Sequence, residues 1–206
     1  MATRRDPGTP RQYPLPHERN LALISNIEIR LELPRGFLLA LRNDESDWGF
    51  VIKIHALIET AVTDGLIRHI DKPTLERQLR KLNFTTKQRL AKDAGLLPGG
   101  GDAFLQEIGS ARNGAAHDVR TAATFSLDVH FKGLSNDRKV SLVGGRLDEG
   151  SASAGAVRSR VWERAISLIA ELEVAEIAAE LLGDPNFKEA IRRQWEESRG
   201  LSSDDK

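Results

Sequence analysis

The sequence contains no cysteine, one methionine and one tyrosine, and aromatic residues make up only 5% of its 206 positions. The absence of cysteine excludes disulfide bonds, thiolate nucleophiles and cysteine-ligated metal sites. No apolar run approaches the roughly 20 residues needed to cross a bilayer, and the N-terminus has no apolar signal core. We therefore expect a cytoplasmic protein that does not enter a membrane.

The sequence also lacks an excess of charge of either sign. Lys plus Arg and Asp plus Glu each number 30, which gives a formal net charge of zero. A neutral chain has no global positive field to recruit nucleic acid, so any such binding must come from a local basic surface. With 40% hydrophobic and 29% charged residues, the composition is typical of one globular domain with appendages.

Proline and arginine concentrate at the N-terminus. Residues 1–16 hold four prolines and three arginines, a composition that cannot bury enough apolar surface to become ordered. We interpret this segment as a flexible basic arm. Residues 17–199 are then expected to form a single helical domain, followed by a polar tail over residues 200–206.

Apolar residues recur at helical spacing over most of this domain. The pattern predicts helices over about 17–33, 44–70, 73–82, 87–94, 157–182 and 187–199, and one from 102 into the segment around Arg112. Residues 37–41 form an apolar run that is too short to distinguish a helical turn from a buried strand. The apolar stripe over 157–182 is predicted to pack within the chain, with a dimer seam as the alternative.

The apolar period changes from near 3.6 to 2 between residues 124 and 143. Apolar and polar residues alternate on both sides of a polar stretch, which is typical of two strands joined by a turn. The alternating apolar residues are Phe125, Leu127, Val129, Phe131, Val140 and Leu142. We therefore predict a β-hairpin over about 124–143, before the long C-terminal helix.

One short segment gathers an arginine, an amide and an imidazole. These are Arg112, Asn113 and His117. Arginine stays charged and can hold a phosphate through two hydrogen bonds. Histidine titrates near pH 6.5 and can therefore give or take a proton at working pH. These are the groups that metal-free RNA cleavage requires.

This motif resembles that of the HEPN superfamily of helical domains, whose signature is an arginine, a polar residue, several more residues and a histidine. The upstream order is also similar, with a helix that carries Glu59, a helix that ends near Gly95, a short loop and the helix that bears Arg112 and Asn113. Over residues 46–120 the spacing most resembles the branch that includes the mannitol-operon repressor proteins. The resemblance implies an all-α, HEPN-like helical bundle, here with the β-hairpin inserted, that forms a homodimer.

Helix geometry limits how the motif can work. A five-residue step on an ideal helix turns about 500°, so Arg112 and His117 point about 140° apart, whereas Asn113 and His117 point about 40° apart. Arg112 therefore cannot meet His117 by spacing alone. Either the helix frays at Gly114, or two copies of the motif face each other across a dimer and share one cleft. The resemblance implies the second arrangement.

The resemblance also implies an activity, that of a metal-independent endoribonuclease used as a toxin or in defence against phage. RNA would be the substrate. His117 would act as general base on a ribose 2′-hydroxyl, and Arg112 would stabilise the charge that builds on the phosphate. Asn113 would orient either the imidazole or the scissile group. The products would carry a 2′,3′-cyclic phosphate and a 5′-hydroxyl end.

Residues outside the motif are candidates for supporting roles. Glu59 would be a partner for Arg112, although a carboxylate that faces solvent explains it equally well. Lys87, Arg89 and Lys92 are the nearest basic residues that could contact RNA, but their spacing is also typical of a solvated helix face.

Motifs for metals and cofactors are missing. His55 and Glu59 are four residues apart on a predicted helix, yet no second histidine lies at ligand spacing. The glycine-rich stretch 95–101 lacks the Gly-Lys-Ser/Thr ending of a phosphate-binding loop. We therefore predict no metal site and no cofactor.

A rival hypothesis explains the motif without catalysis. Arg112 would pair with Glu59, Glu107 or Asp118, and His117 would lie near helix-end carbonyls, where a cation is favoured. The chain would then be a non-catalytic regulator with a protein partner, as the resemblance to the mannitol-operon repressors suggests, whereas a toxin would have an antitoxin as its partner. The zero net charge favours the regulator, and the intact Arg-Asn-x-x-x-His motif favours the nuclease.

Overall fold

The computed structural model describes residues 18–70, 72–116, 124–147 and 155–183. Every regular element in these ranges is an α-helix, so the prediction of an all-α fold is confirmed. The predicted N-terminal arm, the last helix over 187–199 and the polar tail lie outside the described residues. Among the helices described, none has the length and apolar character needed to cross a membrane.

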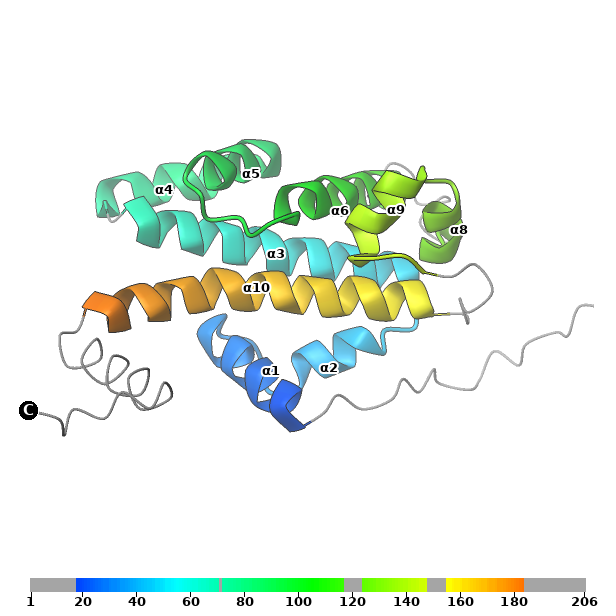
Figure 1. Ribbon diagram of the computed structural model, residues 1–206, viewed down its shortest axis with the longest axis horizontal. Coiled ribbons are helices and arrows are strands. Elements are labelled where there is room, and N and C mark those ends of the chain that lie inside the picture. Colours follow the sequence, from blue (N-terminus) through cyan, green and yellow to red (C-terminus); the bar gives the residue numbers. More distant parts are fainter. Residues whose placement is uncertain (1–17, 71, 117–123, 148–154, 184–206) are drawn as a thin grey trace, which may run out of the picture.

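Two long helices organise the molecule. The helices are α1 (Glu18–Arg30), α2 (Phe37–Arg42), α3 (Asp47–Ile70), α4 (Pro73–Lys81), α5 (Phe84–Asp93), α6 (Gly101–Ala116), α8 (Leu127–Lys132), α9 (Asn136–Val143) and α10 (Ala156–Gly183). Helices α3 and α10 lie side by side and run in the same direction (Figure 1). Helices α1 and α2 pack on one side of this pair, and the helices from α4 to α9 pack on the other.

Polar pairs join α3 and α10 near both ends, and an apolar core fills the space between. Arg158 of α10 pairs with Asp47 at the start of α3, whereas Glu173 of α10 pairs with Arg68 near the end of α3. Buried apolar residues of both helices belong to one core: Phe50, Ile54, Ile58, Leu66, Val161, Ala165, Leu168 and Leu172. The stripe predicted for the C-terminal helix therefore packs within the chain as far as Leu172.

A buried ion pair fixes the end of the bundle where α3, α8 and α10 begin. Arg158 is 1% exposed, and its Nε donates to Oδ1 of Asp47 at 3.0 Å. The other carboxylate oxygen of Asp47 accepts a hydrogen bond from the backbone N–H of Leu127 at 2.9 Å. The guanidinium also donates to the backbone carbonyl of Asp44 and lies 5.0 Å from the ring centroid of Phe50. Asp47 thus connects three helices through one carboxylate.

The β-hairpin predicted over 124–143 is wrong, because this stretch forms helices α8 and α9. Leu127 and Phe131 are four residues apart and pack on the core, while Val129 between them is 69% exposed. The side chain of Ser126 caps α8 by accepting a hydrogen bond from the N–H of Val129 at 3.4 Å. In so short a stretch, alternating apolar residues also include positions that fit one face of a helix. Tertiary packing then decides whether the stretch forms a strand or a helix.

The undecided run over 37–41 is helix α2, and a carboxylate from α1 caps it. Glu28 is 3% exposed and accepts hydrogen bonds from the backbone N–H of Gly36 at 2.8 Å and of Leu38 at 2.9 Å. Gly36 has a φ of 82°, a left-handed conformation that glycine adopts without strain. Because the cap lies eight residues upstream of Gly36, the local pattern could not reveal it.

Replacing Glu28 by alanine is expected to lower the free energy of unfolding by about 1–3 kcal/mol, because backbone N–H groups at the start of α2 lose their acceptor inside the protein. Urea unfolding followed by circular dichroism measures this loss. Glu45→Ala removes an exposed carboxylate and should stay within about 0.5 kcal/mol of the wild type. Equal losses in the two variants would contradict the capping role of Glu28.

Helix α5 begins earlier than predicted. Its cap is Asn83, whose Oδ1 accepts a hydrogen bond from the N–H of Thr86 at 2.9 Å, so Thr85 and Thr86 lie inside the first turn. The loop that follows α5 leads into α6, which contains the predicted motif. Helices α3, α5 and α6 pack against one another, and this packing positions the candidate site.

Candidate functional site

Arg112 and Asn113 lie near the C-terminal end of α6. This helix continues through Gly114 to Ala116, so the predicted alternative in which it frays at Gly114 is wrong. His117 is the next residue in the sequence and lies outside the described residues. The structure therefore places the arginine and the amide of the motif, and the imidazole of His117 remains a sequence-based prediction.

A cleft of about 580 Å³ opens between α3, α5 and α6. Arg112 and Asn113 line it together with His55 and Glu59 of α3, so the structure brings the predicted supporting carboxylate to the motif. The volume is in the range of about 300–1,000 Å³ that is usual for ligand sites. The rest of the wall mixes polar and apolar residues and consists of Asn83, Phe84, Thr85, Gln88, Leu105, Gln106, Gly109 and Ser110.

Arg112 presents a positive charge to this cleft. The residue is exposed, and its Nη1 donates to Oδ1 of Asn113 at 3.1 Å. In the part of the chain that the structure describes, no carboxylate pairs with its guanidinium. Asp118, one of its predicted partners, lies outside the described residues. The two other predicted partners, both carboxylates, are bound to other cations.

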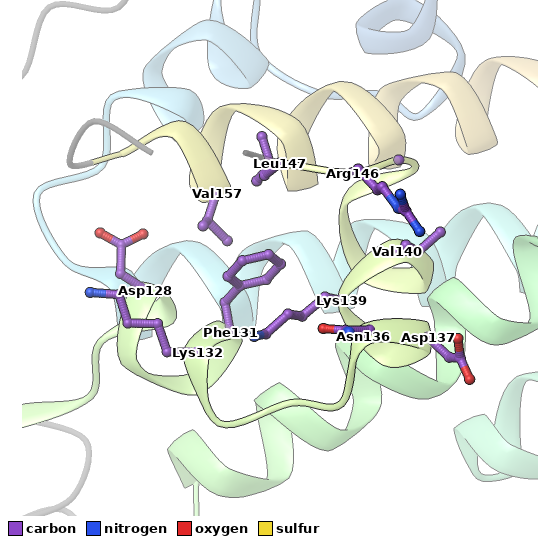
Figure 2. A pocket seen from close by; sticks show the side chains of 11 residues that line it. Asp128, Phe131, Lys132, Asn136, Asp137, Lys139, Val140, Arg146, Leu147 and Val157 are labelled. Carbon is purple, nitrogen blue, oxygen red and sulfur yellow. The ribbon is translucent and has the colours of Figure 1, made fainter. Parts of the chain in front are cut away.

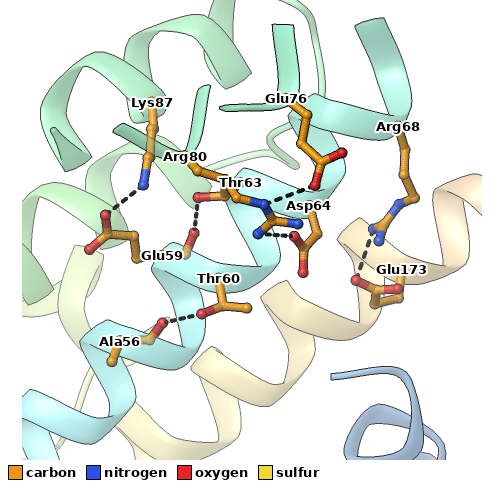
Figure 3. A network of polar contacts seen from close by, with 10 residues as sticks. All are labelled: Ala56, Glu59, Thr60, Thr63, Asp64, Arg68, Glu76, Arg80, Lys87 and Glu173. Carbon is orange, nitrogen blue, oxygen red and sulfur yellow. Dashed lines mark hydrogen bonds and ion pairs between the residues drawn. The ribbon is translucent and has the colours of Figure 1, made fainter. Parts of the chain in front are cut away.

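Glu59 is held by a lysine of α5. Lys87 Nζ lies 2.8 Å from Glu59 Oε1, and the lysine side chain is only 5% exposed. Figure 3 shows the two side chains pointing toward each other between α3 and α5. Because the ammonium is buried in this pair, Lys87 is not placed to contact a phosphate. Glu59 supports the cleft through Lys87 and His55, and no contact with Arg112 is made.

Helix α9 reaches the edge of the cleft through Arg138. Its guanidinium donates to both carboxylate oxygens of Glu107 at 2.8 and 2.9 Å, and its Nη2 lies 3.3 Å from Oγ of Ser110. Glu107 is 7% exposed. The carboxylate that was a predicted partner of Arg112 therefore attaches α9 to α6 instead.

The two other predicted RNA contacts lie outside the cleft lining. Lys92 Nζ is 2.6 Å from Oδ2 of Asp102, a contact that lowers the pKa of Asp102 and raises the pKa of Lys92. Arg89 is exposed on α5. Of the lysines and arginines that the structure describes, Arg112 is the one that lines the cleft.

His55 is a cleft residue that the sequence analysis considered only as a metal ligand. It is 9% exposed, and its ring centroid lies 4.4 Å from that of Phe84. Burial lowers the pKa of His55, the carboxylate of Glu59 opposes this shift, and the charge of Arg112 adds to it. The imidazole is therefore neutral at about pH 7, since its ordinary pKa is already below that value. The spacing to Glu59 was its one sequence signal.

The lowered pKa of His55 makes the stability of the fold depend on pH. The unfolded chain takes up a proton at this residue below about pH 6.5, whereas the folded protein resists it, so stability should fall as the pH drops below that value. Half-buried His130, whose pKa is also lowered by burial, adds a change of the same sign. Urea unfolding above and below this pH should show that the free energy of unfolding decreases less in His55→Gln than in the wild type as the pH is lowered. The exposed His69→Gln should keep the full loss, and identical pH dependence in all three proteins would refute the assignment.

A larger hollow of about 710 Å³ lies between α8, α9 and the start of α10 (Figure 2). Phe131 lies in its middle, with Lys139 Nζ 5.7 Å from the ring centroid. Charged residues of both signs surround the ring, namely Asp128, Lys132, Asp137 and Arg146. Among the described residues that line this hollow there is no histidine, and so no side chain with an ordinary pKa near neutral pH. We therefore place the candidate site in the smaller cleft.

The described residues of the cleft form no set of metal ligands. Within the described ranges, no three His, Asp or Glu side chains lie close enough together to hold a metal ion. The chemistry that its residues offer is a fixed cation, amide and hydroxyl groups, and a neutral imidazole. In comparisons with known proteins, the chain matches no protein-family model, no curated protein and no solved structure.

Proposed function

We propose that the protein is a metal-independent endoribonuclease of the HEPN type, with its active site in the cleft between α3, α5 and α6. Arg112 holds the scissile phosphate, and Asn113 orients it or the attacking group. His117 supplies an imidazole for proton transfer. Attack of the ribose 2′-hydroxyl yields a 2′,3′-cyclic phosphate and a 5′-hydroxyl end.

The observation that carries this proposal is the environment of Arg112. Nearby cations are neutralised, since Lys87 lies 2.8 Å from Glu59, Arg138 lies 2.8 Å from Glu107, and Lys92 lies 2.6 Å from Asp102. Arg112 is left without a carboxylate in the described part of the chain. A guanidinium that no described carboxylate pairs with, at the wall of this cleft, is suited to bind a phosphate through two hydrogen bonds.

The unbroken course of α6 supports a homodimer as the active form. Since the helix is regular through Gly114 to Ala116, side chains five residues apart on it diverge by about 140°. An imidazole from the same chain would then point away from Arg112 if the helix continued by one more residue. In our proposal, two copies of α6 face each other, so that Arg112 of one copy works with His117 of the other.

A non-catalytic regulator is the second candidate function. The pairing of Lys87 and Lys92 with carboxylates favours it, because an RNA-binding groove normally carries more unpaired cations than Arg112 alone. In this proposal, the polar cleft binds a protein partner, and the motif stabilises the dimer. A nuclease used as a toxin would instead be held inactive by an antitoxin, and its expression alone would arrest growth.

Cleavage of labelled RNA in EDTA tests the first proposal against the second. We expect the wild type to cleave and the double variant Arg112→Ala, His117→Ala to be inactive, with both proteins dimeric by light scattering. Product ends identify the chemistry, because a 2′,3′-cyclic phosphate resists phosphatase until it is opened. Absence of cleavage by either protein, with a dimer that dissociates in the variant, would favour the regulator.

A further inference from the structure

His55 is a buried histidine in the cleft for which the Arg-Asn-x-x-x-His motif provides no role. It lies on α3, far from Arg112 in the sequence, yet both residues line the same cavity. The positive charge of Arg112 also contributes to the lowered pKa of His55. A fixed cation and a proton acceptor in one cleft are the groups that phosphodiester cleavage needs.

Two charged side chains follow one another beside this imidazole. Nδ1 of His55 lies 4.0 Å from Oε2 of Glu59, whose other oxygen lies 2.8 Å from Nζ of Lys87. A carboxylate beside one ring nitrogen favours the tautomer that carries its proton there. Nε2 is then the nitrogen without a proton, and it can accept one from a substrate. The Phe84 ring, 4.4 Å from the imidazole centroid, restricts rotation of the ring.

The charge state of His55 agrees with a base. Burial lowers its pKa, and Arg112 of α6 lowers it further, while Glu59 on α3 acts against both. Lys87 of α5 is a further charged group near His55, and its ion pair with Glu59 neutralises it. The result is an imidazole that is neutral at about pH 7 and ready to take a proton.

We propose that His55 is the general base of the RNA cleavage, taking the proton of the ribose 2′-hydroxyl at Nε2 while Arg112 holds the phosphate. This inference rests on the proposed function and gives His117 the role of general acid, in place of the general-base role that the resemblance implies. The 2′-oxygen forms a bond to phosphorus, the bond from phosphorus to the 5′-oxygen breaks, and His117 protonates that oxygen. Water later returns the protons between the two histidines, so no other reactant is consumed.

The test is single-turnover cleavage, in EDTA, of a short oligodeoxynucleotide that contains one ribonucleotide. Rates are measured from acidic to alkaline pH for the wild type, His55→Gln and the exposed control His69→Gln. We expect His55→Gln to be slower by about 10²–10⁴-fold and to lose the acidic limb of the pH profile. His69→Gln should match the wild type, and circular dichroism confirms folding of each variant.

A second variant keeps the assignment testable if His55→Gln does not fold. The double substitution Glu59→Gln, Lys87→Met removes the carboxylate without leaving the ammonium buried and alone. Because Glu59 raises the pKa of His55, the acidic limb should move to lower pH while the alkaline limb stays in place. A purely structural role for His55 would leave the position of that limb unchanged.

The outcomes separate the two proposals. Wild-type rates in folded His55→Gln, or an acidic limb that does not move in the double variant, would overturn the role of His55 and leave the nuclease intact. Loss of cleavage in Arg112→Ala together with normal cleavage in His55→Gln would point in the same direction. A wild type that does not cleave would overturn the proposed function and the role of His55 with it.

Discussion

Asp47→Ala is expected to lower the free energy of unfolding by about 3–5 kcal/mol, because it leaves a buried cation without its counter-charge. Arg158 is 1% exposed, so its guanidinium cannot turn to solvent without opening the bundle. The N–H of Leu127 loses its acceptor in the same variant, which loosens the start of α8. Urea unfolding followed by circular dichroism should show a lower midpoint with an unchanged slope.

Two further variants test whether the instability of Asp47→Ala comes from an uncompensated buried charge or from a general loss of contacts. Arg160→Ala removes an exposed pair, 3.4 Å from Glu163, and should change stability by at most about 1 kcal/mol. The double variant Asp47→Asn, Arg158→Met removes both buried charges and should be more stable than Asp47→Ala. If the double variant were as unstable as Asp47→Ala, the uncompensated charge would not be the cause.

The sequence predicted the long helices well because their apolar residues repeat over many turns. Over α3 and α10 a pattern with period 3.6 extends over many turns, and Pro73 at the start of α4 and Gly183 at the end of α10 mark helix boundaries. The prediction was wrong for α8 and α9 and left α2 undecided, whereas the short helices α4 and α5 were predicted. Helix α8 has six residues, which is less than two turns, so alternation and helical spacing cannot be told apart.

The parts of the site that depend on neighbours in the sequence were predicted, and those that depend on packing were not. Arg112 and Asn113 are adjacent and face one cleft, as the motif requires. The pairing of Glu59 with Lys87 joins residues 28 positions apart, and no local pattern distinguishes Lys87 from the exposed Arg89. No local pattern links His55 to Arg112, because the two residues belong to different helices and share only the lining of the cleft.

Arg112→Ala is expected to slow RNA cleavage by about 10²–10³-fold, the usual effect of removing one charged or hydrogen-bonding group from a transition state. The guanidinium is exposed and pairs with no carboxylate in the described ranges, so its removal strands no buried partner. Stability should therefore stay within about 0.5 kcal/mol of the wild type. Single-turnover cleavage and urea unfolding of the same samples measure the two quantities.

Arg112→Lys tests whether cleavage needs only the positive charge of Arg112 or also the two parallel N–H donors of its guanidinium. Lysine keeps the charge but cannot form two parallel hydrogen bonds to a phosphate, so an intermediate rate is expected if Arg112 holds the scissile group. Arg35→Ala removes an exposed arginine from the loop between α1 and α2 and should cleave at the wild-type rate. Cleavage by Arg112→Ala at the wild-type rate would leave the arginine without a catalytic role. A large loss of stability or of the dimer in that variant would identify Arg112 as structural, because a residue that acts only on the phosphate contributes nothing to the fold in the absence of RNA.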